Sequence, residues 1–235
     1  MEFLQPLAKG HLIRRYKRFL ADVALTNGKV VTAHCANPGS MQGLATKGME
    51  VWLSPAQNPK RKLGWTWELV RVGRGLVGVN TSLPNKIVYE AIAAKGISEL
   101  NGYSEIYREV AYGKASRIDL LLDHPKKGKC FVEVKNVTLK RKCGAEFPDS
   151  VTTRGTKHLG ELTNMIEEGH RAVMLYLVQR NDCGDFRIAS DIDPLYNDAF
   201  QTAITKGVEA ICYSCKLRTN SITIDRPLPV VSGPF

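Results

Sequence analysis

Short segments in which hydrophobic and polar residues alternate run through the first third of the chain, and a period of two residues is typical of β-strands. Glycine, proline and asparagine separate these segments at short intervals, and Asn27-Gly28 is a strong hairpin signal. The pattern predicts roughly five strands closed into a small β-barrel, compatible with an OB fold, although a sandwich or an SH3-like barrel would give a similar pattern. The segments are 12–16, 19–25, 30–34, 48–53, 66–72 and 76–80.

The pattern changes after residues 81–85, where we place a domain boundary. From there the order is one helix, three strands, and then helix, strand, helix and strand, which predicts helices covering a mixed central sheet. The chain is therefore expected to be a two-domain α+β protein, with a barrel over 1–83 and an α/β domain over 84–235. The expected helices are 85–95, 158–169 and 196–206, and the expected strands are 106–112, 116–123, 129–138, 171–179 and 209–217.

Positive charge is concentrated in the predicted barrel. The whole chain carries a formal charge of +10, and residues 1–85 hold 12 Lys/Arg against 4 Asp/Glu, a net of +8. Such asymmetry indicates a polyanionic partner, which we take to be DNA without excluding RNA. Trp67 is expected in the core, and the basic loop before it could equally be a solvated surface loop. The residues predicted to contact nucleic acid are Arg14, Arg15, Lys17, Arg18, Lys60, Arg61, Lys62 and Trp65.

Several other classes of protein are disfavoured. No apolar run approaches the ~20 residues that span a bilayer, so no membrane association is expected. The N-terminus lacks a basic region followed by an apolar stretch, which argues against a signal peptide. The six cysteines then favour reduced thiols in a cytoplasmic protein, because disulfides belong to oxidising compartments. Cys212 and Cys215 have no second pair to complete a zinc site, so we expect two small residues of a strand.

The candidate chemistry lies in two successive predicted strands. Glu133 and Lys135 are two residues apart, so they share one face about 6.6 Å from each other at a rise of about 3.3 Å per residue. Asp119 belongs to the preceding strand, which a hairpin would place alongside. An Asp and a Glu that converge make a hard-oxygen site for Mg²⁺ or Mn²⁺, and the lysine could stabilise charge that builds on phosphorus. The alternative is a structural ion pair at a sheet edge, because Glu-x-Lys is a common tripeptide.

Asp119 followed by Glu133-Val-Lys135 resembles the pattern of the PD-(D/E)XK nuclease superfamily. More specifically, segments along nearly the whole chain resemble the sugar fermentation stimulation protein A family of bacteria and archaea. Ala36 departs from this resemblance, since the family usually has proline there. The segments that carry the resemblance are Cys35-Ala-Asn-Pro-Gly-Ser-Met41, Ser116-Arg-Ile-Asp119, Glu133-Val-Lys-Asn-Val-Thr-Leu139 and the stretch from Phe147 to Leu159.

The resemblance implies an OB-like N-terminal domain, a nuclease-like C-terminal domain, DNA binding with little sequence preference, and a regulatory role in sugar utilisation. It also implies that Asp119 and Glu133 are metal ligands and that Lys135 is the catalytic lysine. An acidic residue on the preceding helix often joins such a site. Glu90 has the right place for that role, although an exposed helix carboxylate is an equal reading, and Glu109 is the weaker alternative.

Three basic residues gather where a helix is expected to begin. Arg154, Lys157 and His158 follow a run of serine and threonine that can cap the helix. Free backbone N–H groups at a helix N-terminus favour anions, whereas cations are disfavoured there unless an anion is present. We therefore predict phosphate contacts for Arg154 and Lys157. His158 could equally be a buried, hydrogen-bonded residue of the helix.

Three functional hypotheses follow. The first is a DNA-binding protein with a metal-dependent nuclease site. The second is a non-catalytic DNA-binding transcriptional regulator on a nuclease-like scaffold, and the sequence leaves open whether the protein is an enzyme. The third, a sequence-specific transcription factor, is disfavoured because no helix-turn-helix signal presents base-reading side chains to the major groove.

Overall fold

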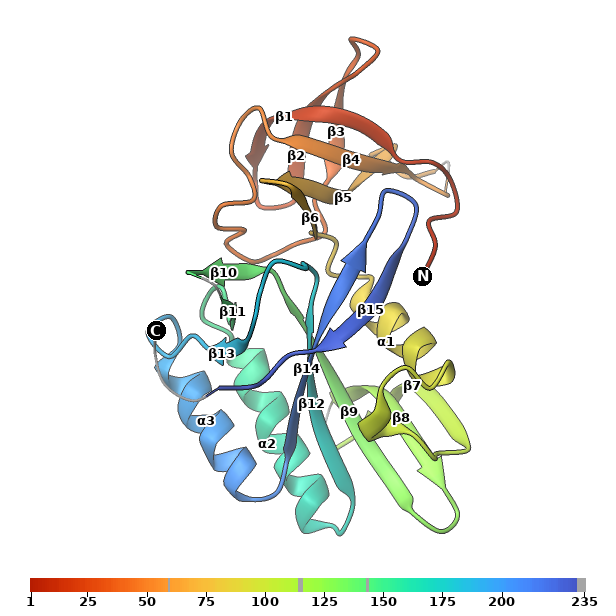
Figure 1. The fold of residues 1–235 in the computed structure, drawn as a ribbon, viewed down its shortest axis with the longest axis vertical. Coiled ribbons are helices and arrows are strands. Elements are labelled where there is room, and N and C mark those ends of the chain that lie inside the picture. Colours follow the sequence, from red (N-terminus) through yellow and green to blue (C-terminus); the bar gives the residue numbers. More distant parts are fainter. Residues whose placement is uncertain (59, 114–115, 143, 232–235) are drawn as a thin grey trace.

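The computed structural model describes residues 1–58, 60–113, 116–142 and 144–231, whose strands and helices form two parts. Figure 1 shows a barrel of N-terminal strands at one end and a larger sheet with helices at the other. This is the predicted architecture of a small barrel and a mixed α/β domain. The predicted boundary at residues 83–84 falls between the last barrel strand and the first helix.

The barrel strands follow the order β3-β2-β1-β4-β5-β6, and an additional pairing of β3 with β5 closes β1 to β5 into a barrel. Alternate side chains point inward, so Leu12, Val23, Leu53 and Trp67 are buried together. The Trp67 indole N–H donates to the carbonyl of Leu69 at 2.9 Å, and its predicted place in the core is confirmed. The strands are β1 (Ala8–Tyr16), β2 (Leu20–Leu25), β3 (Val30–His34), β4 (Glu50–Pro55), β5 (Trp65–Val72) and β6 (Gly75–Gly78).

Among the described residues, the large sheet of the C-terminal domain has the strand order β15-β14-β12-β9-β8-β7. β9, β12 and β14 are parallel, whereas β7, β8 and β15 pair antiparallel with their neighbours, so the sheet is mixed as predicted. Parallel neighbours require crossover connections, which α2 and α3 supply. The strands are β7 (Glu105–Tyr112), β8 (Ser116–His124), β9 (Gly128–Val137), β12 (Arg171–Val178), β14 (Glu209–Leu217) and β15 (Ile222–Pro227).

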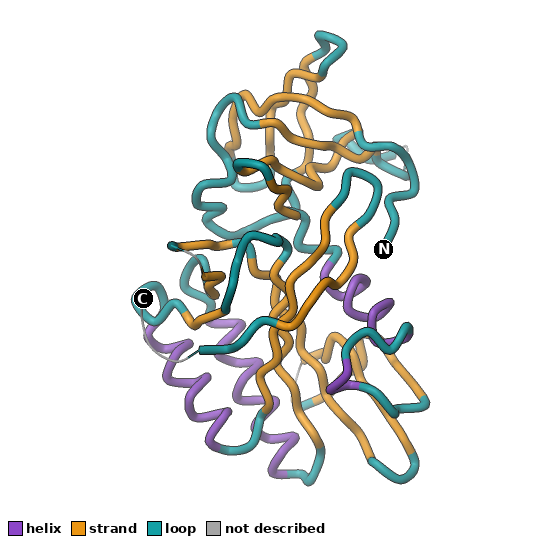
Figure 2. The backbone as a smooth tube through the Cα atoms, in the orientation of Figure 1, coloured by secondary structure: helices purple, strands orange, loops and turns teal. Residues whose placement is uncertain are grey.

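Helices cover both faces of this sheet (Figure 2). α1 packs on the face where Leu120 and Leu122 of β8 are buried, and α2 and α3 pack on the face of Leu121 and Phe131. β8 thus contributes side chains to two hydrophobic cores, because successive side chains of a strand alternate between the two faces of the sheet. The helices are α1 (Pro84–Ala93), α2 (Thr153–Glu167), α3 (Pro194–Thr205) and the short 3-10 helix η1 (Ser98–Leu100). A small separate sheet is formed by β10 (Leu139–Arg141), β11 (Gly144–Phe147) and β13 (Phe186–Ile188).

Side-chain caps set where α2 and α3 begin. The Thr152 hydroxyl accepts a hydrogen bond from the Gly155 N–H at 3.1 Å, and the Asp193 carboxylate accepts one from the Tyr196 N–H at 3.0 Å. Each cap satisfies a backbone donor that has no partner inside the helix. α2 therefore starts at residue 153, where the run of serine and threonine predicted a cap, five residues before the first residue of the hydrophobic periodicity.

The two domains share an apolar contact. Trp52 and Leu69 of the barrel are buried in the same cluster as α1 and the central sheet. Met1 is buried in that cluster too, and the N–H of Phe3 donates to a carbonyl in the β14–β15 turn, so residues 1–3 pack on the C-terminal domain. The Gly78 N–H at the end of the barrel donates to the carbonyl that follows β12 at 2.9 Å. These contacts fix the barrel against the carboxyl ends of the central strands (Figure 1).

The described cysteines are all free and buried, and Cys143 lies outside the described residues. Cys212 and Cys215 both belong to β14, the strand that the alternating pattern predicted. Burial raises the pKa of both thiols, because an apolar environment disfavours the thiolate. Both cysteines are therefore inert core residues at neutral pH.

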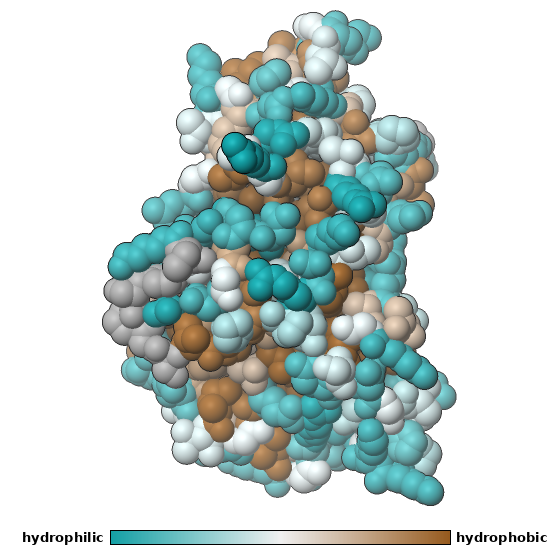
Figure 3. Space-filling view, in the orientation of Figure 1, coloured by the Kyte–Doolittle hydropathy of each residue, from teal (hydrophilic) through white to brown (hydrophobic). Residues whose placement is uncertain are grey.

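The surface is predominantly hydrophilic on the face drawn in Figure 3. No described helix is both long and apolar enough to cross a membrane. Hydrophobic residues show on this face mainly between hydrophilic ones, which is usual for a folded domain.

Candidate active site

Asp119 and Glu133 lie on neighbouring strands at the point where β8 and β9 separate. The ladder ends on this side with the pair Leu120 and Val132, and Asp119 and Glu133 each lie one position beyond it. Glu133 points to the face covered by α2, where His158 contacts it, whereas Asp119 reaches Asn85 at the start of α1. The Asp119 Oδ2 accepts a hydrogen bond from the Val134 N–H at 2.8 Å, so this carboxylate continues the pairing in place of backbone.

Glu133 is buried, and its two carboxylate oxygens have different surroundings. Oε1 accepts a hydrogen bond from the Lys135 ammonium at 2.8 Å and is in short contact with the Nδ1 of His158. Oε2 is buried without a hydrogen-bond partner among the described residues. Burial alone would raise the pKa of Glu133, but the hydrogen bond from His158 and the charge of Lys135 outweigh it and lower the pKa. The predicted shared face of Glu133 and Lys135 is confirmed by their ion pair.

His158 connects α2 to this group. Arg154, one helical turn earlier, donates from Nε to the His158 Nε2 at 3.3 Å. A guanidinium can only donate, so this Nε2 is an acceptor and the neutral ring carries its proton on Nδ1, facing Glu133. Lys135, whose Nζ lies 3.0 Å from the same Nδ1, then donates to Glu133. Of the two readings of His158, the buried and hydrogen-bonded one is correct, and it lies within the candidate site.

Asp119 is held by two donors and carries a strongly perturbed pKa. Asn85, at the start of α1, donates to Oδ1 at 2.7 Å, and the Val134 N–H donates to Oδ2. Burial, together with the nearby charge of Glu133, raises the pKa of Asp119 to about 6. Two carboxylates that oppose each other's ionisation are stabilised by a shared cation.

The donor set fits a divalent cation. Glu133 supplies a buried carboxylate oxygen without a hydrogen-bond partner, and Asp119 supplies a carboxylate whose ionisation a cation would favour. Among the described residues, no group of three or more His, Cys, Asp or Glu side chains is arranged to hold a metal. Mg²⁺ commonly binds through one or two carboxylates and keeps several waters, so two protein ligands are sufficient for that ion.

The structure places Glu90 outside this group. Its carboxylate lies 2.7 Å from the Met1 amino group. At about 100° per residue, position 90 is rotated about 140° around α1 from Asn85, the residue that faces Asp119. The prediction of Glu90 as a third ligand is therefore corrected. Glu109 is nearer, because Asn85 also donates to its Oε1 at 3.2 Å.

The basic residues of the first predicted cluster have separate roles. Arg14 pairs with Asp22 at 2.8 Å and is 66% exposed. Arg15 is half-buried and donates to two backbone carbonyls of the loop after β3, at 2.9 and 3.1 Å, so it holds that loop in place. Lys17 and Arg18 form the exposed β1–β2 turn in left-handed backbone conformation, with φ of 46° and 62°. The cations available to a ligand are therefore chiefly those of the turn.

The second basic cluster lies at one mouth of the barrel. Arg61 donates from Nη1 to the Thr66 hydroxyl at 3.2 Å, and with Lys62 it lines an open groove. Lys60 is exposed nearby. Trp65 is half-buried against the barrel core, so only part of its ring is accessible to a base. The groove combines cations with apolar walls, which suits a nucleic-acid strand.

Arg154 and Lys157 lie at the N-terminal end of α2, beside the carboxylates. Arg154 is exposed and bonded to His158, whereas Lys157 is 53% exposed and 3.5 Å from Glu161. Their placement agrees with a phosphate contact, which stays a prediction. Sequence reasoning missed Asn85, and the signal available was an amide side chain in the first turn of the helix that precedes the Asp119 strand.

Comparison with known proteins agrees with this architecture. The protein-family model "SfsA N-terminal OB domain" matches residues 13–79, and the family model "Sugar fermentation stimulation protein RE domain" matches residues 82–221. Pyrococcus furiosus SfsA, solved in complex with Ca²⁺, is similar with a TM-score of 0.90 at 25% identity, covering 99% of this chain and 98% of that one.

Sequence relatives match the chain nearly end to end. A sugar fermentation stimulation protein homolog of Paramagnetospirillum magneticum is 60% identical over 228 residues, which is 97% of each chain. The homolog of Rhodospirillum rubrum is 52% identical over 244 residues, covering 99% of this chain and 100% of the relative. On these matches and on the two domains they describe, the chain belongs to the sugar fermentation stimulation protein family.

Proposed function

We propose that the protein binds DNA with little sequence preference and hydrolyses phosphodiester bonds at Asp119, Glu133 and Lys135, using Mg²⁺ or Mn²⁺. The observation that carries this proposal is the buried Glu133 oxygen without a hydrogen-bond partner among the described residues, on a carboxylate whose charge raises the pKa of the nearby Asp119. Buried carboxylates whose pKa values are pushed apart are typical of catalytic sites. The Ca²⁺ in the complex of Pyrococcus furiosus SfsA supports a divalent-cation site in this fold.

Each side chain of the group has a distinct role in this proposal. Asp119 and Glu133 would hold the cation, which when bound polarises the phosphodiester and lowers the pKa of a water molecule. Asn85 and the Val134 N–H orient Asp119, while His158 orients Glu133. These partners fix both carboxylates before substrate arrives, so little reorganisation is needed during the reaction.

Lys135 supplies positive charge where the phosphate would lie. Its ammonium is mostly buried and bonded to Glu133 at 2.8 Å, which restricts its position. Charge that develops on a phosphoryl oxygen is stabilised by an ammonium held in this way, and the effect is larger in a partly buried site than in water. Arg154, at the N-terminal end of the neighbouring helix, adds a second cation close to the same place.

The proposed DNA contacts are electrostatic. A net charge of +10, the exposed Lys17–Arg18 turn, and the groove lined by Arg61 and Lys62 support binding to phosphates rather than to base edges. RNA is not excluded by this chemistry, because no feature of the basic residues distinguishes a ribose from a deoxyribose.

A cleavage assay tests the proposal. Supercoiled, linear, branched and single-stranded DNA, with RNA alongside, would be incubated with wild type and with Glu133→Gln, Lys135→Ala and Lys29→Ala proteins, in Mg²⁺ or Mn²⁺. Lys29 is an exposed cation on the β2–β3 turn and serves as the matched control. We expect wild type and Lys29→Ala to cut, and the other two variants to bind DNA without cutting.

Two results would contradict the proposal. Cutting by Glu133→Gln at the wild-type rate would show that the activity lies elsewhere or in a contaminant. Tight, salt-sensitive binding without cutting by wild type on any substrate would favour a binding protein on a nuclease scaffold. That second reading has one observation in its favour, namely that Lys135 is already paired with Glu133.

A further inference from the structure

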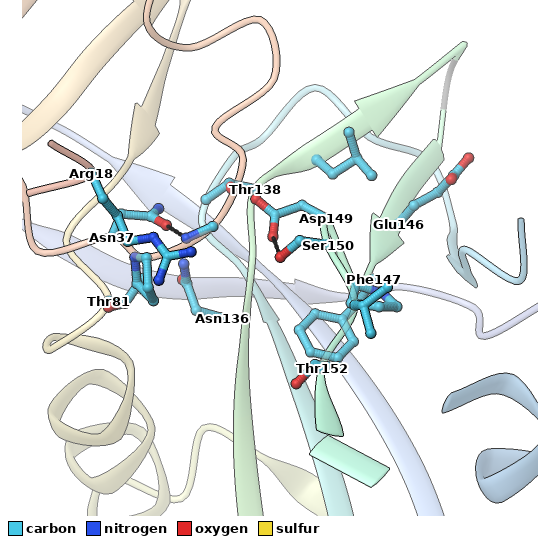
Figure 4. A pocket seen from close by; sticks show the side chains of 15 residues that line it. Arg18, Asn37, Thr81, Asn136, Thr138, Glu146, Phe147, Asp149, Ser150 and Thr152 are labelled. Carbon is cyan, nitrogen blue, oxygen red and sulfur yellow. Dashed lines mark hydrogen bonds between the residues drawn. The ribbon is translucent and has the colours of Figure 1, made fainter. Parts of the chain in front are cut away.

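A cavity of about 350 Å³ lies between the barrel and the C-terminal domain (Figure 4). Its walls include Arg18 from the β1–β2 turn, Asn136 from the end of β9, Thr138 just after that strand, and Thr152 at the start of α2. Thr152 caps α2, the helix that carries Arg154 and His158, so the cavity lies near the candidate active site. It also lies at the carboxyl end of the parallel strand β9, where ligands bind in open α/β sheets.

The cavity contains hydrogen-bonding groups that the described residues leave unused. The Arg18 guanidinium forms no hydrogen bond or ion pair with them. Asn136 uses its oxygen to accept from Gln179 at 2.6 Å, which leaves its NH₂ group without a described partner. The hydroxyl of Thr138 also has none, although Thr138 is only 5% exposed. These three groups can therefore form hydrogen bonds with a ligand that enters the cavity.

Two carboxylates also belong to the walls. Glu146 is ion-paired with Arg141 through Oε2, while its Oε1 is buried without a hydrogen-bond partner among the described residues. Asp149 accepts hydrogen bonds from the Ser40 hydroxyl at 3.4 Å and from the Met41 N–H at 3.3 Å. Figure 4 shows the Glu146 side chain directed away from Arg18 and Asn136. Arg18 is therefore the cation that lines the Asn136 end of the cavity.

The turn that carries Arg18 has an unusual backbone. Lys17 and Arg18 are both non-glycine residues in left-handed conformation, with φ of 46° and 62°. Two such residues in succession are disfavoured, and a disfavoured conformation that the fold maintains often serves a binding function. Here the conformation places Arg18 at the cavity, on the same side as Asn136 in the view of Figure 4.

We propose that this cavity binds a single unpaired nucleotide of the substrate strand, beside the phosphodiester that is cut. Its volume falls within the range of small-ligand pockets and is too small for a double helix. Arg18 would contact a phosphate, and the Asn136 amide and the Thr138 hydroxyl would contact the base or sugar. The inference rests on the proposed function and names the substrate feature that the site selects, a strand end or an unpaired nucleotide.

The test is calorimetric binding of thymidine 3′,5′-bisphosphate, thymidine and inorganic phosphate in metal-free buffer. These titrations need no cleavage, so they are independent of whether the protein proves to be a nuclease. The proteins are wild type, Arg18→Ala, Thr138→Val and the control Lys29→Ala, with melting temperatures measured to verify that each is folded. Thr138→Val keeps the side-chain shape and removes only the hydroxyl.

We expect the bisphosphate to bind wild type and Lys29→Ala at least about tenfold more tightly than either thymidine or phosphate, and each cavity variant to lose about tenfold. Equal affinities for the bisphosphate in all four proteins, or no binding to wild type, would overturn the inference. Phosphate binding as tightly as the bisphosphate, without an effect of Thr138→Val, would also overturn it, because the cavity would then recognise only an anion. Cleavage without nucleotide binding would leave the proposed function standing and refute the nucleotide site.

Discussion

His158 offers a sharp test of how the candidate active site is held together, because two substitutions separate its contacts. The ring is 5% exposed and donates from Nδ1 to Glu133, a carboxylate that is 3% exposed. His158→Asn keeps an N–H donor near the position of Nδ1. His158→Leu has a similar volume to histidine but provides no donor, so it leaves the buried Glu133 charge with Lys135 as its remaining side-chain partner.

The two variants should differ in stability by an amount that the contact itself determines. A hydrogen bond to a charged group contributes about 1.5–3 kcal/mol, and His158→Leu loses it entirely. For a chain of about this size, 1 kcal/mol corresponds to about 2–4 °C in melting temperature, so we expect a decrease of about 3–12 °C. His158→Asn should lose only about 1 kcal/mol, or about 2–4 °C, through lost packing and the lost acceptor for Arg154.

Thermal unfolding followed by circular dichroism would measure both shifts in metal-free buffer. A matched control is Thr163→Val, which removes a buried hydroxyl on the same helix that bonds only to the backbone carbonyl of Leu159 at 2.9 Å. If His158→Leu melts at the same temperature as His158→Asn, or above it, the hydrogen bond to Glu133 is not what stabilises this site, and the assigned tautomer would lose its support.

Two further predictions concern the barrel. Replacing Lys60, Arg61 and Lys62 together by alanine should weaken DNA binding similarly on all sequences and reduce the slope of log affinity against log salt by about 2.7. Fluorescence anisotropy at several salt concentrations would measure this slope. An unchanged slope would show that this loop is not part of the DNA interface. Glu68 is buried, and burial raises its pKa despite hydrogen bonds from Ser54 and Asn80. Because the folded state then holds the proton more tightly than the unfolded state, stability falls as pH rises through the pKa of Glu68. Glu68→Gln should therefore melt above wild type at about pH 8, with the difference lost at about pH 3.5, and an equal or lower melting temperature at about pH 8 would contradict this.

The central sheet and the helices that cover it could be predicted from the local pattern of hydrophobic and polar residues. Period-two alternation located β7, β8 and β9 to within a residue or two, and the continuous apolar run located β12. Short or edge strands were not predicted, among them β10, β13 and β15, because few of their side chains are buried and their pairing depends on distant segments. Burial of Trp67 followed from its alternating neighbours.

In the candidate site, too, the local relations could be predicted from the sequence and the packing of the helices could not. Spacing alone predicted that Glu133 and Lys135 share a face, and the hairpin order predicted Asp119 beside them, because both relations follow from local strand geometry. Which helix side chains reach the site depends on how each helix is rotated and packed. Asn85 rather than Glu90 therefore faces Asp119, and His158 lies against Glu133.

The sequence by itself determined the two-domain fold, the two carboxylates, the lysine and the basic character of the barrel, since each rests on residues close together in the chain. Only the tertiary structure decided that the β1–β2 turn meets the end of β9 across a cavity, about 120 residues away along the chain. The physical reason is that domain docking depends on apolar contacts such as Trp52 and Leu69 against the C-terminal core. No local periodicity specifies those contacts, because the barrel's own strands bury the same residue types on the inside.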